Sequence, residues 1–232
     1  SILSQNDLKS KLGENPQYTI DLSEAGQTWY IHSGIVDKSS PFYGDYIDDS
    51  SKGSNGGTSD TLAISLNSGF GTYPQSLCPY NEVKKGFSET LRYYSDYRLK
   101  DYSEISNNKD TLKSKIVSNG AVTVYYPSIT DCYSSDYANY YSDNTCRGIG
   151  DSHLIVVVGW DDNYSKDNFT GKVKPSNDGA WLCKNSWGEH YGNDGYIWIS
   201  YDTTKLAFSQ YIMQDNNAYD NEYQNCFVTQ GY

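Results

Sequence analysis

The sequence predicts an α+β fold, in which a mainly helical first part precedes a part built from antiparallel strands. Up to about residue 104, apolar residues recur at helical spacing between segments rich in Gly, Ser and Asp. Beyond that point, short apolar runs follow one another with polar, Gly-rich loops between them. Because helices do not alternate regularly with strands, a parallel sheet of βαβ units is not expected.

The helices are predicted from leucine spacing and from capping residues. Residues 1–13 carry leucines at helical spacing and end at Gly13, a suitable C-cap. The segment 21–24 (DLSE) begins a second helix, with its aspartate or its serine as the N-cap. Further helices are predicted over 58–68 and 108–118.

The strands are predicted from apolar runs rich in β-branched and aromatic residues, over 121–126, 153–160, 180–184 and 196–201. The predicted organisation is a helical subdomain over 1–104 and a β-rich subdomain over 105–205. The segment 206–232 is again polar and tyrosine-rich, so we expect a linker or the start of a following domain there.

Composition excludes some classes of function. The chain has 232 residues and a net charge of -11, with only 18 Lys and Arg, so nucleic-acid binding is disfavoured. The mean hydropathy is -0.72, and no apolar run approaches the ~20 residues of a membrane-spanning helix. The 24 tyrosines, with many Asn, Asp, Ser and Gly, are typical of secreted bacterial surface proteins, so a secreted or cell-surface location is expected.

The five cysteines leave two interpretations open. Cys132 and Cys146 flank a tyrosine-rich loop, where a disulfide would close about 15 residues and stabilise the fold by roughly 3 kcal/mol in the chain-entropy model. Such a bond requires an oxidising compartment, and two unpaired thiols are the alternative. Cys183 lies inside an apolar run and is expected to be a small buried hydrophobe.

His153 and Asn185 form the candidate catalytic pair. His153 begins an apolar run, where a titratable ring needs a partner to offset its desolvation. The Asn185 amide oxygen can accept a hydrogen bond from the ring and orient it without adding a formal charge, which suits a thiolate–imidazolium pair. Trp187 can cover this hydrogen bond and exclude water. Alternatively, Asn185 caps a turn and Trp187 belongs to the core.

The chain resembles the papain-like cysteine peptidases in five blocks that occur in the family's order. These blocks are DLSE at 21–24, GSNGG at 53–57, the Tyr-Pro and Pro-Tyr pairs at 73–74 and 79–80, DSHLIVVVGW at 151–160, and CKNSWG at 183–188 followed by YGNDGYI. The resemblance implies a papain-like fold, with a helical left subdomain and a right subdomain resembling an antiparallel β-barrel. It also implies cysteine-type hydrolysis of peptide bonds.

By this resemblance, His153 and Asn185 are catalytic and Trp187 supports them. Gly56 and Gly57 would bind an extended protein or peptide substrate through their backbone groups. Leu154 and Tyr125 would line the pocket for the side chain two positions before the cut, although Tyr125 also fits a core strand position. The family needs no cofactor or metal.

The acidic segment 161–169 resembles the bacterial branch, in which a lectin-like domain follows the peptidase. A propeptide or this lectin-like domain is therefore an expected partner. Alternate oxygen ligands in the segment also invite a calcium interpretation. The glycine and the closing glutamate of an EF-hand are missing, which favours a solvated loop.

One catalytic element of the family is missing. Its nucleophilic cysteine begins a long helix near the mature N-terminus, and residues 1–12 resemble the body of that helix. The resemblance therefore implies a chain truncated at its N-terminus, with the nucleophile preceding Ser1, and we expect residues 1–232 alone to be inactive. Cys146, seven residues before His153, is a weaker alternative nucleophile, because no helix follows it to lower its pKa.

Two other classes of function stay open. A homologue that has lost its nucleophile would keep the groove and act as a peptide-binding or cell-surface binding module. A cysteine amidase or transferase would act on cell-wall peptides instead of proteins. The residue at the nucleophile position distinguishes the binding module from a peptidase. Assays on protein and cell-wall substrates distinguish the amidase or transferase.

Overall fold

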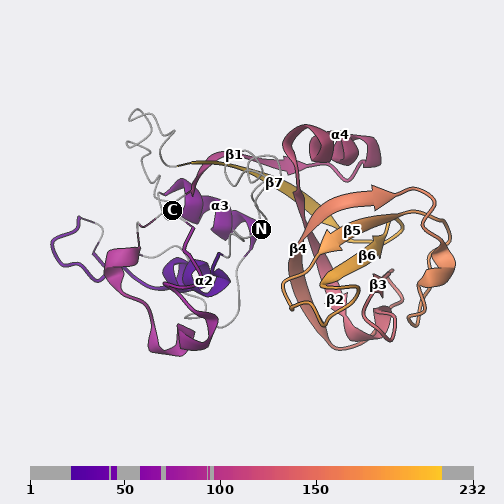
Figure 1. Cartoon of the computed structure of the whole chain (residues 1–232), viewed down its shortest axis with the longest axis horizontal. Helices are drawn as coiled ribbons and strands as arrows, with labels where there is room; N and C mark the ends of the chain where they lie inside the picture. Colours follow the sequence, from indigo (N-terminus) through magenta and orange to yellow (C-terminus); the bar gives the residue numbers. More distant parts are fainter. Residues whose placement is uncertain are drawn as a thin grey trace. The chain divides into compact units, whose positions relative to one another are not determined.

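The computed structural model describes residues 22–41, 43–45, 58–68, 72–92, 94 and 97–215, which separate into two compact units (Figure 1). Among these residues, the helical unit contains those up to Tyr102 and those from Ile212 onward. The β-rich unit contains Ser103–Tyr211. The division between the units therefore falls inside two strands, β1 (Tyr97–Ile105) and β7 (Ala207–Asp215).

The helical unit contains the helices predicted to start within 21–24 and to cover 58–68. Helix α2 (Glu24–His32) is capped by Ser23, whose Oγ accepts the Gly26 N–H at 2.9 Å. Helix α3 (Ser59–Asn67) begins with a capping box at Thr58. Two short 3₁₀ helices follow, η1 (Tyr80–Lys85) and η2 (Glu89–Leu91). The helix predicted over 1–13 lies outside the described residues.

A buried arginine ties the end of α2 to η2. The Arg92 side chain is fully buried and forms an ion pair with Glu89. Its guanidinium also donates to the carbonyl oxygens of Tyr30, at 3.2 Å, and Gly34, at 3.0 Å. Because a buried cation is costly unless it is paired and hydrogen-bonded, these partners explain how the unit accommodates Arg92.

The β-rich unit is built on a sheet with strand order β1-β7-β2-β4-β5-β6-β3. Its remaining strands are β2 (Val122–Ile129), β3 (Asn139–Tyr140), β4 (Gly150–Asp161), β5 (Ala180–Lys184) and β6 (Tyr196–Ser200). Strand β4 is antiparallel to both β2 and β5, while β3 is parallel to β6. The predicted α+β class and the four predicted strands are confirmed, with shifts of a few residues at their ends.

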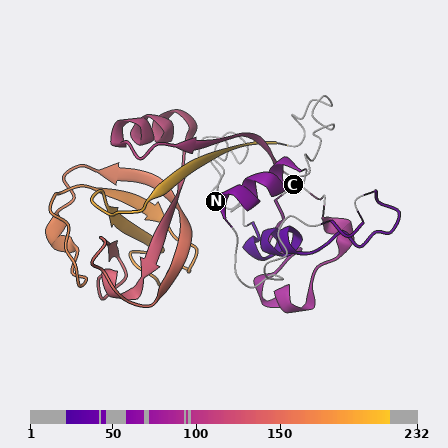
Figure 2. The same ribbon diagram turned by 180° about the vertical axis from the view of Figure 1, so that it is seen from behind.

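Helix α4 (Lys109–Asn119) lies against the sheet, as both views show (Figures 1 and 2). The Asn108 side chain caps it by accepting the Thr111 N–H at 3.0 Å. The helix ends at Gly120, which has φ of 88°, a conformation that favours glycine. Leu112 on its inner face is 1% exposed and belongs to the core of the sheet. The helix predicted over 108–118 is thus confirmed.

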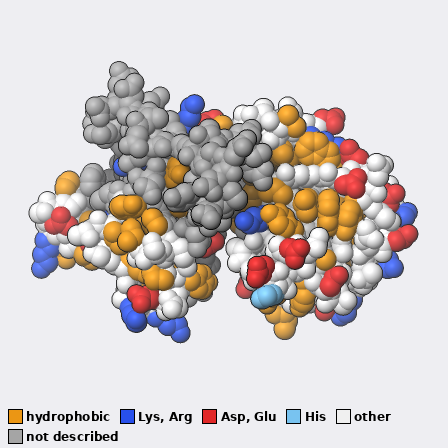
Figure 3. All heavy atoms as spheres, viewed as in Figure 1, with side chains coloured by type: hydrophobic (Ala, Val, Ile, Leu, Met, Phe, Trp, Pro, Cys, Tyr) orange, Lys and Arg blue, Asp and Glu red, His pale blue; other side chains and the backbone are white. Residues whose placement is uncertain are grey.

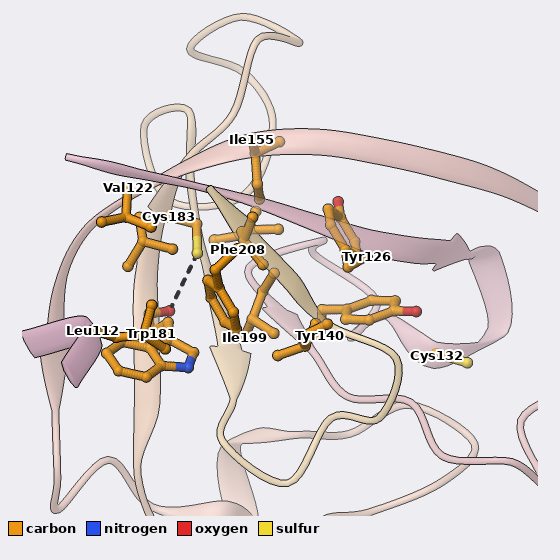
Figure 4. Packing of buried hydrophobic residues seen from close by; sticks show 14 of the residues in the cluster. Leu112, Val122, Tyr126, Cys132, Tyr140, Ile155, Trp181, Cys183, Ile199 and Phe208 are labelled. Carbon is orange, nitrogen blue, oxygen red and sulfur yellow. Dashed lines mark hydrogen bonds between the residues drawn. The ribbon is translucent and has the colours of Figure 1, made fainter. Parts of the chain in front are cut away.

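The core of the β-rich unit gathers side chains from α4 and from most strands (Figure 4). Trp181 and Cys183 of β5 point into it beside Phe208 of β7. The Cys183 thiol donates to the Trp181 carbonyl oxygen at 3.7 Å, within the range for a sulfur donor. Cys183 is fully buried, so the prediction that it acts as a small buried hydrophobe is confirmed.

Cys132 and Cys146 form a disulfide, with their Cα atoms 6.4 Å apart. The interpretation of these cysteines as two unpaired thiols is therefore wrong. Both residues are buried, and Cys132 ends the 3₁₀ helix η3 (Thr130–Cys132) directly after β2. The bond closes the loop that contains β3, so it limits the freedom of the segment between β2 and β4.

Strands β1, β3 and β7 were not expected from the sequence. The polar segment 206–232 was assigned to a linker or a following domain, but Ala207–Asp215 forms β7 and pairs with β2. Its polar residues are buried because they have partners: Thr123 Oγ1 donates to the Ser209 carbonyl oxygen at 2.8 Å, and Asn119 donates to Gln210 Oε1 at 3.1 Å. Residues 216–232 lie outside the described part.

The surface agrees with the acidic composition. On the face shown in Figure 3, basic side chains are scattered and form no continuous stripe. In the part of the chain that the structure describes, no helix is long and apolar enough to cross a membrane.

Candidate active site

The register of β4 and β5 brings the two candidate catalytic residues together. Val156 on β4 pairs with Lys184 at the end of the antiparallel β5. The chain that continues from β5 therefore passes alongside the residues that precede Val156. Asn185 is the first residue after β5, and His153 lies three residues before Val156, so the two meet although 32 positions separate them in sequence.

His153 Nε2 and Asn185 Oδ1 lie 2.9 Å apart. The same Oδ1 accepts the Ser186 backbone N–H at 2.8 Å, which identifies this atom as the acceptor of the amide group. His153 must therefore donate from Nε2. In the neutral ring this leaves Nδ1 without a proton and able to accept one.

Trp187 covers one face of the histidine. Its ring stacks on the imidazole of His153 with centroids 4.7 Å apart and planes 12° apart. Asn185 is only 7% exposed, whereas Trp187 is 37% exposed. The indole therefore lies between solvent and one side of the histidine, while its own outer surface stays accessible.

Glycines with positive φ fold the loop that carries this tryptophan. Gly188 follows Trp187 directly and has φ of 91°, a conformation that side chains other than glycine rarely adopt. Gly192 has φ of 62°, and a Cβ at this position would lie 2.4 Å from the Tyr196 carbonyl oxygen. The loop returns to β6 through the Asn193 N–H, which donates to the Tyr196 carbonyl oxygen at 2.9 Å.

Two tyrosines beside the histidine were not identified from the sequence. Tyr126 pairs with His153 across β2 and β4, and their ring centroids lie 5.8 Å apart. The buried hydroxyl groups of Tyr126 and Tyr133 are 2.6 Å apart, and the Tyr133 ring lies 6.2 Å from that of Trp187. The alternation of residues on β2 was a signal for Tyr126, but its use requires the register with β4.

Burial dominates the electrostatics of the site. Desolvation lowers the pKa of His153, and its hydrogen bond to Asn185 acts in the opposite direction. Burial also raises the pKa of Tyr133 to about 12, so this phenol is neutral at physiological pH. The side of His153 that faces Tyr126 and Tyr133 is therefore buried and uncharged.

We expect His153 in residues 1–232 to titrate below its ordinary value of 6.5. The Asn185→Asp variant should raise this pKa, because a carboxylate facing Nε2–H stabilises the imidazolium. Since the folded-state pKa lies below the unfolded value, the unfolded chain binds more protons as pH falls. His153 should therefore reduce stability below about pH 6.5 and have no effect well above it.

Proton NMR titration of the three imidazoles measures this directly. Asn163→Asp is the matched control, because it adds the same charge at an exposed loop position. A His153 pKa above 6.5 in the unmodified chain would contradict the dominant effect of burial. A pKa that is unchanged by Asn185→Asp would contradict the assigned hydrogen bond.

The candidate substrate-binding residues are placed differently from the catalytic pair. Tyr125 and Leu154 are direct partners across β2 and β4, and both are half-buried. Side chains alternate along a strand, so this pair occupies the opposite face of the sheet from Tyr126 and His153. The Tyr125 hydroxyl donates to Ser152 Oγ. The predicted glycines at 56 and 57 lie outside the described residues.

None of the cysteines in the described residues is suited to act as a nucleophile beside His153. Cys146, the weaker alternative suggested by the sequence, is held in the disulfide with Cys132. Cys78 and Cys183 are free but buried, and burial raises the pKa of both thiols. Cys226 lies outside the described part of the chain.

Two carboxylates of the acidic segment 161–169, those of Asp161 and Asp162, are engaged by protein groups. Asp161 Oδ1 accepts the Asn163 N–H at 2.8 Å, and Asp162 forms an ion pair with Lys113 at 2.5 Å. Among the described residues, no cluster of three or more His, Cys, Asp or Glu side chains is arranged to hold a metal ion.

The sequence profile of the papain family of cysteine proteases matches residues 43–219, well over half of the chain. The chain belongs to the papain family. Among curated proteins, it is 29% identical to rat procathepsin L over 162 residues, which cover 67% of this chain and 44% of that protein. It is also 27% identical to mouse testin-2 over 120 residues, covering 50% of this chain and 34% of testin-2.

Solved structures of cysteine proteases support the same fold. The protease and lectin-like domains of Cwp84, a surface-layer-associated protein of Clostridium difficile, align with a TM-score of 0.69 and 30% identity. That alignment covers 95% of this chain and 49% of the Cwp84 chain. A second structure, Cwp84 after propeptide cleavage, gives a TM-score of 0.67 at 30% identity over 86% of this chain and 48% of that one. The chain thus spans about half the length, or less, of these relatives.

Proposed function

We propose that the complete polypeptide containing this chain is a cysteine-type peptidase that hydrolyses peptide bonds in proteins or peptides. The observation that carries the proposal is the Nε2–Oδ1 hydrogen bond between His153 and Asn185, with Trp187 stacked on the imidazole. Membership of the papain family supports the same chemistry.

In the proposed reaction, His153 Nδ1 takes the proton from a cysteine thiol. The resulting thiolate attacks the substrate carbonyl carbon, and the imidazolium then gives its proton to the departing amine. Water cleaves the thioester in the second half-reaction, again with His153 as base and then acid. Asn185 holds the ring so that Nδ1 faces the reacting atoms. Trp187 keeps water from the hydrogen bond between His153 and Asn185.

We assign the nucleophilic cysteine to sequence that precedes Ser1. Each of the four cysteines in the described residues is either disulfide-bonded or a buried thiol with a raised pKa. Backbone groups near the missing nucleophile would stabilise the oxyanion. Gly56 and Gly57 would bind the substrate backbone, and Leu154 with Tyr125 would contact the side chain two positions before the cut.

We further propose a secreted or cell-surface location, with a propeptide and a lectin-like domain as neighbours in the complete polypeptide. The buried Cys132–Cys146 disulfide supports an oxidising compartment. The clostridial relative is itself described as surface-layer associated and carries a lectin-like domain.

The test compares residues 1–232 with the complete polypeptide on peptidyl-coumarin amides and on protein substrates. We expect thiol-dependent hydrolysis by the complete polypeptide and none by residues 1–232. Mass spectrometry after iodoacetamide treatment should find the rapidly labelled cysteine upstream of Ser1.

Three results would contradict this proposal. Robust thiol-dependent turnover by residues 1–232 would show that the site is wrongly assigned. Serine or glycine at the nucleophile position, with peptide binding but no turnover, would favour a binding module. Hydrolysis of cell-wall peptides but not of proteins would favour an amidase.

A further inference from the structure

Three exposed aromatic rings form a continuous surface beside His153, which we call the aromatic shelf: Tyr137, Trp187 and Tyr191. Their exposed fractions are 38%, 37% and 44%. The Trp187 and Tyr191 centroids lie 5.5 Å apart, and the Tyr191 and Tyr137 centroids lie 6.0 Å apart. Both pairs meet edge to face, so ring surfaces stay open to solvent.

The backbone fixes Tyr137 in place. Its φ is 57°, a conformation that is uncommon for a tyrosine and persists only where its surroundings demand it. The Tyr137 N–H donates to the Ser134 carbonyl oxygen at 2.9 Å. Asp136 Oδ1 accepts from Ser134 Oγ at 2.5 Å and from the Ala138 N–H at 3.0 Å. The ring is thus presented by a turn that is ordered before any ligand arrives.

The inner side of the shelf is also ordered. Tyr133 is 6% exposed, and its ring lies 5.2 Å from Tyr137 and 6.2 Å from Trp187. Its hydroxyl group is bonded to that of Tyr126. Each of the four rings of Tyr133, Tyr137, Tyr191 and Trp187 therefore contacts two of the others. The distances from Trp187 to Tyr191 and on to Tyr137 are ones that an extended peptide covers in a few residues.

The shelf lies where the leaving part of a substrate has to pass. In peptide hydrolysis, His153 gives its proton to the departing amine, so the chain after the cut begins within hydrogen-bonding reach of the imidazole. Trp187 stacks on that imidazole, and the other two rings continue from it. Tyr137 has a costly backbone conformation and yet leaves part of its ring exposed, and that exposure does not stabilise the fold. This combination points to a ligand for the exposed ring.

We propose that Tyr137 and Tyr191 select apolar or aromatic side chains at the second and third positions after the cleaved bond. This inference rests on the proposed peptidase function. The occupant is the leaving segment of a peptide substrate. Ring stacking provides the attraction, and the Asp136 carboxylate beside Tyr137 disfavours acidic side chains there. Hydrogen bonds from Ser134 and Ala138 lower the pKa of Asp136, so it stays ionised.

The experiment uses the complete polypeptide and internally quenched peptides that differ only at the second and third positions after the cut. For the unmodified enzyme, we expect kcat/KM with phenylalanine there to exceed that with glycine or aspartate by about tenfold. Tyr137→Ala and Tyr191→Ala should each reduce this ratio by about fivefold. Tyr137→Phe should retain the ratio, because the aromatic ring is kept and phenylalanine has to adopt the same positive φ.

A peptidyl-coumarin amide has no amino acids after the cut, so its hydrolysis should be unchanged in Tyr137→Ala and Tyr191→Ala. Val117→Ala removes an exposed apolar side chain from α4 and is the matched control for both substrates. If the unmodified enzyme does not hydrolyse the coumarin amide, the proposed function is refuted, and the proposal for the aromatic shelf with it. Normal coumarin hydrolysis with equal cleavage of all peptides would refute the shelf alone.

Discussion

Replacement of His153 by alanine in the complete polypeptide is expected to lower kcat/KM on coumarin amides by about a thousandfold or more. General acid–base catalysis by a positioned side chain contributes about 10²–10⁴-fold, and here one ring acts in both half-reactions. The neutral thiol is also a poor nucleophile without a base to receive its proton. Because Nε2 is committed to Asn185, the loss removes the one ring nitrogen free for this transfer.

The effect should appear in kcat rather than in KM, because His153 does not bind the substrate before reaction. His190→Ala is the matched control, since His190 is an exposed histidine in the loop after Trp187. Circular dichroism should show that both variants fold. Activity of His153→Ala within tenfold of the unmodified enzyme would contradict its assignment as base and acid.

Replacement of Trp181 by alanine is expected to destabilise residues 1–232 by about 3–5 kcal/mol. Trp181 is 1% exposed. Its ring centroid lies 4.6 Å from that of Tyr201 and 6.1 Å from that of Phe208. Removing the indole leaves a cavity among side chains from separate strands, which cannot all move to fill it. Because natural domains have only about 5–15 kcal/mol of stability, the variant should be close to unfolding.

Urea denaturation followed by circular dichroism measures this loss. Trp187→Ala is the matched control, because the same side chain is removed at a position that is 37% exposed. Its loss of stability should be clearly smaller than that of Trp181→Ala. Equal losses at the two positions, or a loss below about 1 kcal/mol for Trp181→Ala, would contradict the predicted effect of removing a buried side chain.

The candidate site residues that the sequence indicated are those that lie within or next to regular structure. His153 and Asn185 adjoin strongly apolar runs, so their strands and their order were recognisable without a structure. The position of Tyr126 beside His153 depended on the register of β2 with β4, which no local pattern specifies. Tyr137 was hidden for a different reason, because its exposed position follows from a positive φ in an irregular loop.

The same limit explains the strands that were not predicted. In β7 the buried polar side chains of Ser209 and Gln210 are hydrogen-bonded to Thr123 of β2 and to Asn119 at the end of α4. Composition marks such a segment as exposed, since buried polar groups are rare unless they are bonded. Their partners lie far away in the sequence, so only the folded chain identifies β7 as part of the sheet.

The late position of β7 in the chain also affects how the protein folds. Thr123 and Ser209 bond to each other across 86 positions, so this pairing closes a very long loop. Non-local strand pairing of this kind slows folding. During synthesis, β2 has a free edge on this side until β7 has left the ribosome, and a free strand edge can pair with other chains. The newly synthesised chain is therefore expected to be prone to aggregation until β7 pairs with β2.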